Sequence, residues 1–150
     1  MSRAFKNIES TNKLNKYLHK IGTDKDVPTV FLFKNNKTLI GFRNYTPDKW
    51  KTISIWTVPG GRCDEGETFE VTLRREVFEE VGIDKFEITE YLGSVAGAKE
   101  GDTVFVFKGV TSEEEKLMEP EKFSEWKWCP VSEIPENFIS PTSLKLIRKY

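Results

Sequence analysis

The apolar positions of this chain follow two spacings, one typical of helices and one typical of strands. Within residues 9–22, Tyr17 and Leu18 follow Leu14 by three and four positions. Residues with this spacing lie on the same side of a helix. Gly22 closes the segment, as glycine often does after a helix C-terminus. The pattern predicts a short amphipathic helix.

Runs rich in β-branched and aromatic residues predict strands farther along the chain. They span residues 28–33, 38–42, 53–59, 86–95, 103–110 and 124–131. The Asn35-Asn36 pair predicts a tight turn between the first two strands, and residues 99–102 predict a turn between the fourth and the fifth. In the last strand, Trp126 and Trp128 alternate with a lysine, so we expect both rings on one face.

A longer helix is predicted from Thr68 to Val81. Thr68 can cap its N-terminus, and Gly82 stands where a left-handed residue commonly ends a helix. Val71 and Phe78 lie on a different side from the main apolar stripe, so we expect the helix to be covered on two flanks. The stripe consists of Phe69, Leu73, Val77 and Val81.

The chain closes with a helix predicted over residues 140–150. Ser140 is suited to its N-cap, and Pro141 to its first helical position. Strands and helices therefore interleave along the sequence, which favours an α/β sandwich. A length of 150 residues suits a single domain, 1–150.

Composition limits the function classes. The chain is 37% hydrophobic and 13% aromatic, enough for a real core, and its net charge is −1. No overall field therefore indicates a nucleic-acid or membrane partner. No apolar run is long enough to span a bilayer, and the N-terminus lacks the apolar segment of a signal peptide. Cys63 and Cys129 match no metal-binding spacing and are interpreted as free thiols in a reducing compartment. We therefore expect a cytoplasmic protein.

The predicted helix at 68–81 carries an unusual cluster of like charges. Glu76, Glu79 and Glu80 lie within about 100° of its surface. Like charges three and four residues apart destabilise a helix, and only Arg74 and Arg75 lie nearby in sequence. A solvated helix face is the ordinary explanation. A divalent cation is the alternative, because carboxylate oxygens are the ligands that Mg²⁺ and Mn²⁺ prefer.

The surrounding stretch resembles the sequence signature of the Nudix hydrolases, G-x5-E-x7-R-E-U-x-E-E-x-G-U, where U is a bulky aliphatic residue. The likeness extends over most of residues 28–139 and leaves the N-terminal helix outside it. Every fixed position of the signature is matched, at Gly61, Glu67, Arg75, Glu76, Val77, Glu79, Glu80, Gly82 and Ile83.

The resemblance implies an α/β/α sandwich with a mixed, partly antiparallel sheet and a catalytic loop followed by a helix. Residues 1–27 would form an N-terminal helical extension of the single Nudix domain. Relatives of this kind hydrolyse a diphosphate that links a nucleoside to another group. They hold it through Mg²⁺, for which Mn²⁺ can substitute. Small Nudix proteins are often dimers, so a homodimer stays open.

The resemblance also assigns roles to residues. Glu76, Glu79 and Glu80 would be metal ligands, with Glu76, Glu79 and Arg75 counted in the catalytic machinery. Glu67 is expected to pair with Arg75. Gly60 and Gly61 would allow the backbone to approach the substrate closely.

The general base and the nucleoside site stay open. The base is either a glutamate of the signature or an acidic residue on a later loop, for which Glu119 and Glu121 are candidates. Arg43, at the end of the second strand, is a candidate for binding a phosphate, with a surface arginine as the alternative. Trp56, just before the glycine-rich loop, is a candidate for stacking on the base, with a core position as the alternative.

Substrate choice follows from what the sequence lacks. The segment after the signature, residues 94–101, carries none of the tags of the ADP-ribose, dinucleoside polyphosphate or NADH subfamilies. The chain is most similar to the small MutT-like nucleoside triphosphate diphosphatases. A nucleoside diphosphate-sugar pyrophosphohydrolase is one alternative. A non-catalytic nucleotide-binding module is another, although such modules usually lack one or more of the glutamates.

Overall fold

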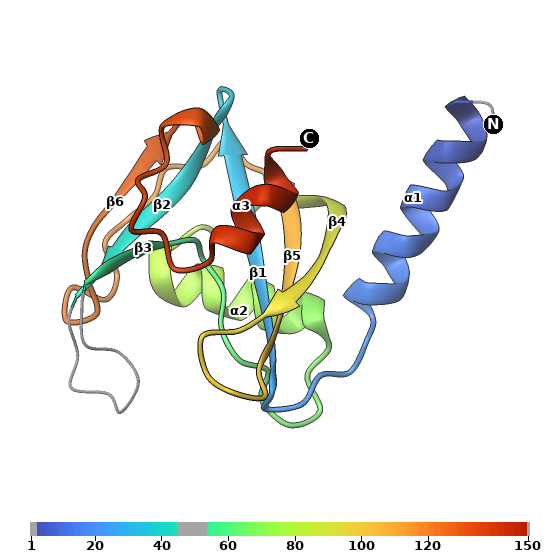
Figure 1. Cartoon of the computed structure of the whole chain (residues 1–150), viewed down its shortest axis with the longest axis horizontal. Helices are drawn as coiled ribbons and strands as arrows, with labels where there is room; N and C mark the ends of the chain where they lie inside the picture. The colour runs from blue at the N-terminus through green and yellow to red at the C-terminus, as the bar shows by residue number, and fades with distance from the viewer. Residues whose placement is uncertain (1–2, 45–53, 150) are drawn as a thin grey trace.

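The computed structural model describes residues 3–44 and 54–149, which form a mixed six-stranded sheet between helices (Figure 1). The strand order is β3-β2-β1-β5-β4, and β6 pairs with the other edge of β2. The strands are β1 (Asp26–Lys34), β2 (Lys37–Arg43), β3 (Ile55–Thr57), β4 (Glu87–Ala96), β5 (Thr103–Val110) and β6 (Phe123–Cys129). The helices are α1 (Arg3–Leu18), α2 (Phe69–Val81), the short 3₁₀ turn η1 (Val131–Glu133) and α3 (Pro141–Ile147). The expected fold class is confirmed.

The two central strands separate at one end, and this opening positions the loop after β3. The Asn35-Asn36 turn, with φ of 51° and 64°, joins β1 to β2 as predicted. The register of β1 with β2 covers only the two residue pairs nearest that turn, whereas β1 pairs in parallel with β5 over residues 26–33. At the open end, the Val30 N–H donates to the Pro59 carbonyl, and the Gly61 N–H donates to the Pro28 carbonyl.

A core lies on each face of the sheet, because successive strand residues point to opposite sides. Val30 and Leu32 of β1 contribute to the core beneath α2, and Phe31 contributes to the core beneath α3. Figure 1 shows α2 and α3 on opposite faces. The apolar stripe predicted for α2 is fully buried, with all four members at 0% exposure.

Several predicted boundaries and one predicted flank differ from the structure. Helix α1 begins at Arg3, well before residue 9, and α3 ends at Ile147. Strand β3 is shorter than residues 53–59, of which residue 53 lies outside the described part. The expectation that α2 is covered on two flanks was wrong. Val71 and Phe78 are 52% and 49% exposed, because the sheet covers only one side of the helix.

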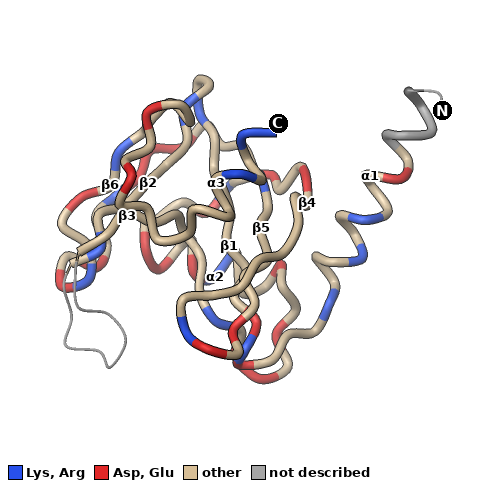
Figure 2. The backbone as a smooth tube through the Cα atoms, viewed as in Figure 1, with Lys and Arg blue, Asp and Glu red and all other residues tan. Residues whose placement is uncertain are grey.

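Helix α1 is attached to the rest of the molecule through its last turn. Leu14, Tyr17 and Leu18 pack against the core as predicted, and the Tyr17 ring stacks on Tyr91 at 3.9 Å between centroids. The remainder of the helix extends away from the sheet (Figure 1). Among the described residues, no helix combines the length and apolar character needed to cross a membrane. Basic and acidic residues are interspersed along the chain (Figure 2).

Candidate active site

The loop between β3 and α2 approaches both β1 and α2 closely, and a glycine stands at each point of closest approach. Gly60 has a φ of 152°, and a Cβ there would lie 2.5 Å from the Pro28 carbonyl oxygen. A Cβ at Gly61 would lie 2.6 Å from Glu76 Oε1. Real Cβ atoms do not approach other atoms so closely. The loop therefore lies directly against β1 at Gly60 and against the Glu76 carboxylate at Gly61.

The ends of α2 are set by local sequence. The Thr68 hydroxyl accepts a hydrogen bond from the Val71 N–H at 3.2 Å, which satisfies one free donor of the first turn. Gly82 ends the helix in the left-handed conformation with a φ of 68°. Between these ends, burial of the apolar stripe against the sheet fixes the rotation of the helix. That rotation decides where the three glutamates point.

Glu80 points inward, toward the loop. It is 5% exposed, and its Oε1 accepts a hydrogen bond from the Gly60 N–H at 2.9 Å. Burial raises the pKa of Glu80 well above its usual range, and the nearby carboxylates of Glu76 and Glu119 raise it further. The Gly60 hydrogen bond and the charge of Arg43 act in the opposite direction. A buried carboxylate with acidic neighbours is suited to a cationic ligand.

Glu76 and Glu79 are both oriented by Arg75. The Arg75 Nη1 donates to Glu76 Oε1 at 2.8 Å and to Glu79 Oε2 at 3.4 Å. Burial raises the pKa of Glu76, although Arg75 counteracts part of this effect. The Glu79 side chain is 48% exposed. The three glutamates thus lie in three different environments, from buried to solvated.

The expected pair between Glu67 and Arg75 joins the loop to the helix. Arg75 Nε donates to Glu67 Oε2 and its Nη2 to Oε1, both at 2.8 Å. The Asp64 N–H and the Thr72 hydroxyl also donate to Glu67 Oε1, at 2.8 and 2.9 Å. These donors stabilise the carboxylate, and the bond from Arg75 is the largest cause of its lowered pKa of about 2.

This pair predicts an acid-sensitive contribution to stability. Because the pKa of Glu67 is about 2 when folded and near 4.5 otherwise, the ionised pair stabilises the protein above pH 4.5 and is lost as the pH falls toward 2. The shift corresponds to roughly 3 kcal/mol at neutral pH. We expect Glu67→Gln to lower the melting temperature at pH 7 and to lower it much less near pH 2. Thermal denaturation across this range, followed by circular dichroism, measures the difference, and an equal loss at both ends would contradict it.

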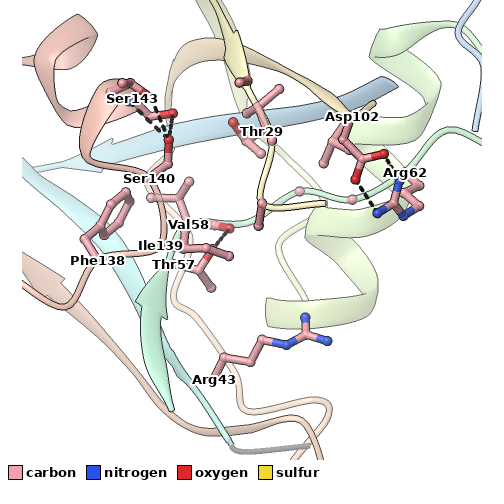
Figure 3. Close-up of a pocket in the computed structure, with 18 of the residues that line it drawn as sticks. Thr29, Arg43, Thr57, Val58, Arg62, Asp102, Phe138, Ile139, Ser140 and Ser143 are labelled. Carbon is pink, nitrogen blue, oxygen red and sulfur yellow. Dashed lines mark hydrogen bonds and ion pairs between the residues drawn. The ribbon is translucent and has the colours of Figure 1, made fainter. Parts of the chain in front are cut away.

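A pocket of about 420 Å³ opens beside the loop, between the diverging strands and the segment before α3 (Figure 3). Of the expected site residues, Arg43, Gly60, Gly61 and Glu80 line it. The buried Arg43 Nε has no hydrogen-bond partner among the described residues, and the guanidinium lies over the Phe123 ring at 5.9 Å. Arg43 therefore brings a positive charge close to Glu80, while its buried Nε makes no hydrogen bond among the described residues.

Trp56 and the two later general-base candidates are not among the residues that line the pocket. Trp56 is 8% exposed and packs against Phe42 in the core beneath α3. Its neighbours Thr57 and Val58 line the pocket instead. Of the two candidates for a later general base, Glu119 lies near enough to raise the pKa of Glu80. Glu121 is exposed.

Sequence reasoning missed two parts of the pocket wall. One is the segment from Phe138 to Ser143, whose path along β3 is fixed by hydrogen bonds to the Trp56 backbone. The other is the ion pair of Arg62 with Asp102, forty positions apart in sequence. Neither carries a local sequence signal, because each depends on a contact between distant segments.

The carboxylates fit a hard divalent cation in chemistry, but they do not converge as they stand. Among residues 3–44 and 54–149, no group of three or more His, Cys, Asp or Glu side chains is arranged to hold a metal ion. Glu80 is turned toward Gly60, and Glu76 and Glu79 toward Arg75. The buried, mutually repelling Glu76 and Glu80 nevertheless supply the oxygen ligands that Mg²⁺ and Mn²⁺ prefer.

The family model of the NUDIX domain matches residues 24–150. The chain therefore belongs to the Nudix hydrolase family, whose members generally use divalent metal ions. This confirms the family that the sequence resembles.

Individual relatives agree with this assignment. An RNA pyrophosphohydrolase of Bartonella henselae is 31% identical over 112 residues, covering 60% of this chain and 65% of the relative. The NAD-capped RNA hydrolase NudC of Mannheimia succiniciproducens is 32% identical over 102 residues, covering 65% of this chain and 38% of the relative. The chain thus spans less than two thirds of either relative. A Nudix hydrolase structure from Nitrosomonas europaea has the same fold, with a TM-score of 0.69, 19% identity, and coverage of 87% of this chain and 72% of that one.

Proposed function

We propose that this protein hydrolyses a nucleoside diphosphate linked to another group, with a nucleoside triphosphate as the preferred substrate and Mg²⁺ as the cofactor. The products would be a nucleoside monophosphate and pyrophosphate. The observation that carries the proposal is the buried Glu80 carboxylate, held by the Gly60 N–H at a pocket that Arg43 also lines. Negative ligand groups and a positive donor at one pocket are suited to a metal-bound phosphate chain.

The charge of each site residue indicates which part of a metal-bound substrate it would bind. Arg43 would bind a phosphate oxygen, because it brings a positive charge to the wall of the pocket. Glu76 and Glu80, with the more exposed Glu79, would hold the cation. A bound Mg²⁺ would neutralise phosphate charge and activate water. The hydrolysis itself adds water across one P–O bond of the diphosphate, and the proton of the water passes to a carboxylate of the site.

The size of the pocket suits a nucleoside. Its volume of about 420 Å³ lies within the usual range for small-molecule sites. Apolar walls from Val58 and Ile139 alternate with hydroxyls from Thr57 and Ser140. We further infer that residues 1–150 form a single Nudix domain with residues 1–27 as a helical extension, acting on small nucleotides in the cytoplasm.

A nucleotide panel tests the proposal. The panel comprises nucleoside triphosphates, a nucleoside diphosphate-sugar and a 5′-triphosphorylated RNA, each with Mg²⁺ and with a chelator. We expect Mg²⁺-dependent release of pyrophosphate from a triphosphate. Orthophosphate with a nucleoside diphosphate would contradict the proposed bond, and hydrolysis of the sugar nucleotide alone would favour the first alternative.

A matched control separates the site from the helix that carries it. Glu70 lies on the first turn of α2 and pairs with Arg74, away from the signature glutamates. Glu70→Gln is expected to retain full turnover on the panel. Binding of nucleotides without any hydrolysis would favour the non-catalytic module.

A further inference from the structure

We propose that Asp102 is a positioning residue, which acts through Arg62 to hold one wall of the pocket against the glycine-rich loop. This inference rests on the proposed function in one respect, that the pocket receives the substrate. The wall is formed by residues 96–98, at the end of β4 and before the turn that leads into β5. Asp102 stands at the end of that turn and Arg62 in the loop (Figure 3).

The contact between the two side chains is bidentate and shielded. Arg62 Nη1 donates to Asp102 Oδ1 at 2.7 Å, and Nη2 donates to Oδ2. The Asp102 side chain is 3% exposed. Paired hydrogen bonds between guanidinium and carboxylate fix direction as well as distance. Arg62 Nη1 also donates to the Asp24 carbonyl at 3.1 Å, so one side chain connects three segments of the chain.

The β4–β5 pairing ends with Ala96 and Thr103, so residues 97–101 extend beyond the last strand pair. Residues 99–101 are exposed, and Gly97 is joined to Asp102 by a backbone hydrogen bond of 2.9 Å. A Cβ at Gly97 would lie 2.6 Å from Asp102 Cβ, so the two residues are in close contact. Displacing Asp102 therefore displaces residues 96–98 with it.

The link continues from Arg62 to the helix. The Arg62 carbonyl accepts from Arg75 Nη2 at 3.3 Å, and Arg75 in turn binds Glu76. Glu76 and Glu80 also have bonds that do not involve Arg62, to Arg75 and to Gly60. Loss of Asp102 should therefore loosen the pocket wall more than the carboxylates.

The electrostatic environments of Arg62 and Arg43, which both line the pocket, indicate different roles. Asp102 compensates the charge of Arg62, whereas the Arg43 Nε has no partner among the described residues. Arg62 orients the loop, and Arg43 is left to bind phosphate. If Arg62 bound phosphate instead, removing the Asp102 charge would release it and tighten substrate binding. The direction of the change in KM thus distinguishes the two roles.

The experiment compares Asp102→Asn with the wild type in kinetics and in hydrogen exchange. We expect kcat/KM to fall about tenfold, mostly through a higher KM. In the protein without nucleotide or metal, amides of residues 60–63 and 97–103 should exchange faster together. Gly97→Ala should reproduce both effects while keeping the carboxylate. The control is Glu90→Gln, which removes the partner of Lys108 on the same β4–β5 hairpin, and should change neither.

Each outcome decides the proposal. A lower KM in Asp102→Asn would overturn it in favour of phosphate binding by Arg62. Unchanged KM, or faster exchange confined to residues 97–103, would also overturn it, because the loop would then be held independently. If the wild type hydrolyses no nucleotide, the proposed function fails on its own, and exchange in the two segments still decides whether Asp102 holds the loop.

Discussion

Glu80→Gln is expected to lower Mg²⁺-dependent turnover by roughly 10²- to 10³-fold while raising the melting temperature of the metal-free protein. Glutamine has nearly the same size, and its amide oxygen can accept the hydrogen bond that Gly60 donates to Glu80. What the substitution removes is a negative charge on a side chain that is 5% exposed. The activity and the stability therefore change in opposite directions.

The sign of the stability effect follows from the raised pKa of Glu80. In the unfolded chain the carboxyl titrates near its ordinary value of 4.5. Between that pH and the higher folded pKa, the folded state binds more protons than the unfolded state, so stability falls as the pH rises through this window. Glu80→Gln removes this dependence, and its advantage in melting temperature should grow from pH 4.5 upward.

With Mg²⁺ added, we expect the wild type to have a higher melting temperature than Glu80→Gln. An ion that binds the native carboxylates stabilises the wild type, and Glu80→Gln should respond much less. Glu79→Gln is the matched control, because Glu79 is 48% exposed and its removal relieves little burial of charge. It should lower turnover without raising the melting temperature. Thermal denaturation with chelator and with Mg²⁺ provides both measurements, and a lower metal-free melting temperature for Glu80→Gln would contradict the argument.

Helix α2 could be predicted closely because its determinants are local. Thr68, Gly82 and the spacing of the apolar stripe all lie within the segment they define. The Glu67–Arg75 pair was available from the signature for the same reason. The turn at Asn35-Asn36 likewise depends on two adjacent residues that accept positive φ.

The remainder of the site depends on how distant strands meet. Trp56 and Thr57 are adjacent, but pairing of β3 with β2 places the Trp56 ring in the core and Thr57 at the pocket. No local pattern determines which of the two faces inward. The same holds for Arg62 and Asp102, which the parallel pairing of β1 with β5 brings together. The exposed flank of α2 has a related cause, since apolar spacing identifies the side facing the sheet and not what covers the other side.

Gly61→Ala is expected to reduce kcat by about 10²-fold with little change in melting temperature. A Cβ at this position would lie 2.6 Å from Glu76 Oε1. Either the Glu76 carboxylate turns away, or the loop moves off the Pro28 carbonyl, to which the Gly61 N–H donates at 3.2 Å. Both adjustments misplace a group next to the reacting phosphate. Gly61 is not among the described residues with positive φ, so alanine adds no backbone strain of that kind.

Gly66→Ala provides the matched control within the same loop. A Cβ there meets nothing within 4 Å, but Gly66 has a φ of 82°, so the substitution adds a left-handed strain of about 1–2 kcal/mol. Gly66→Ala should therefore lower the melting temperature and retain kcat, whereas Gly61→Ala should lower kcat and retain the melting temperature. Combining Gly61→Ala with Glu76→Gln tests the mechanism further. Because both act on the same carboxylate, the double variant should lose little more than Glu76→Gln alone, and fully additive losses would show that Gly61 acts on something other than Glu76.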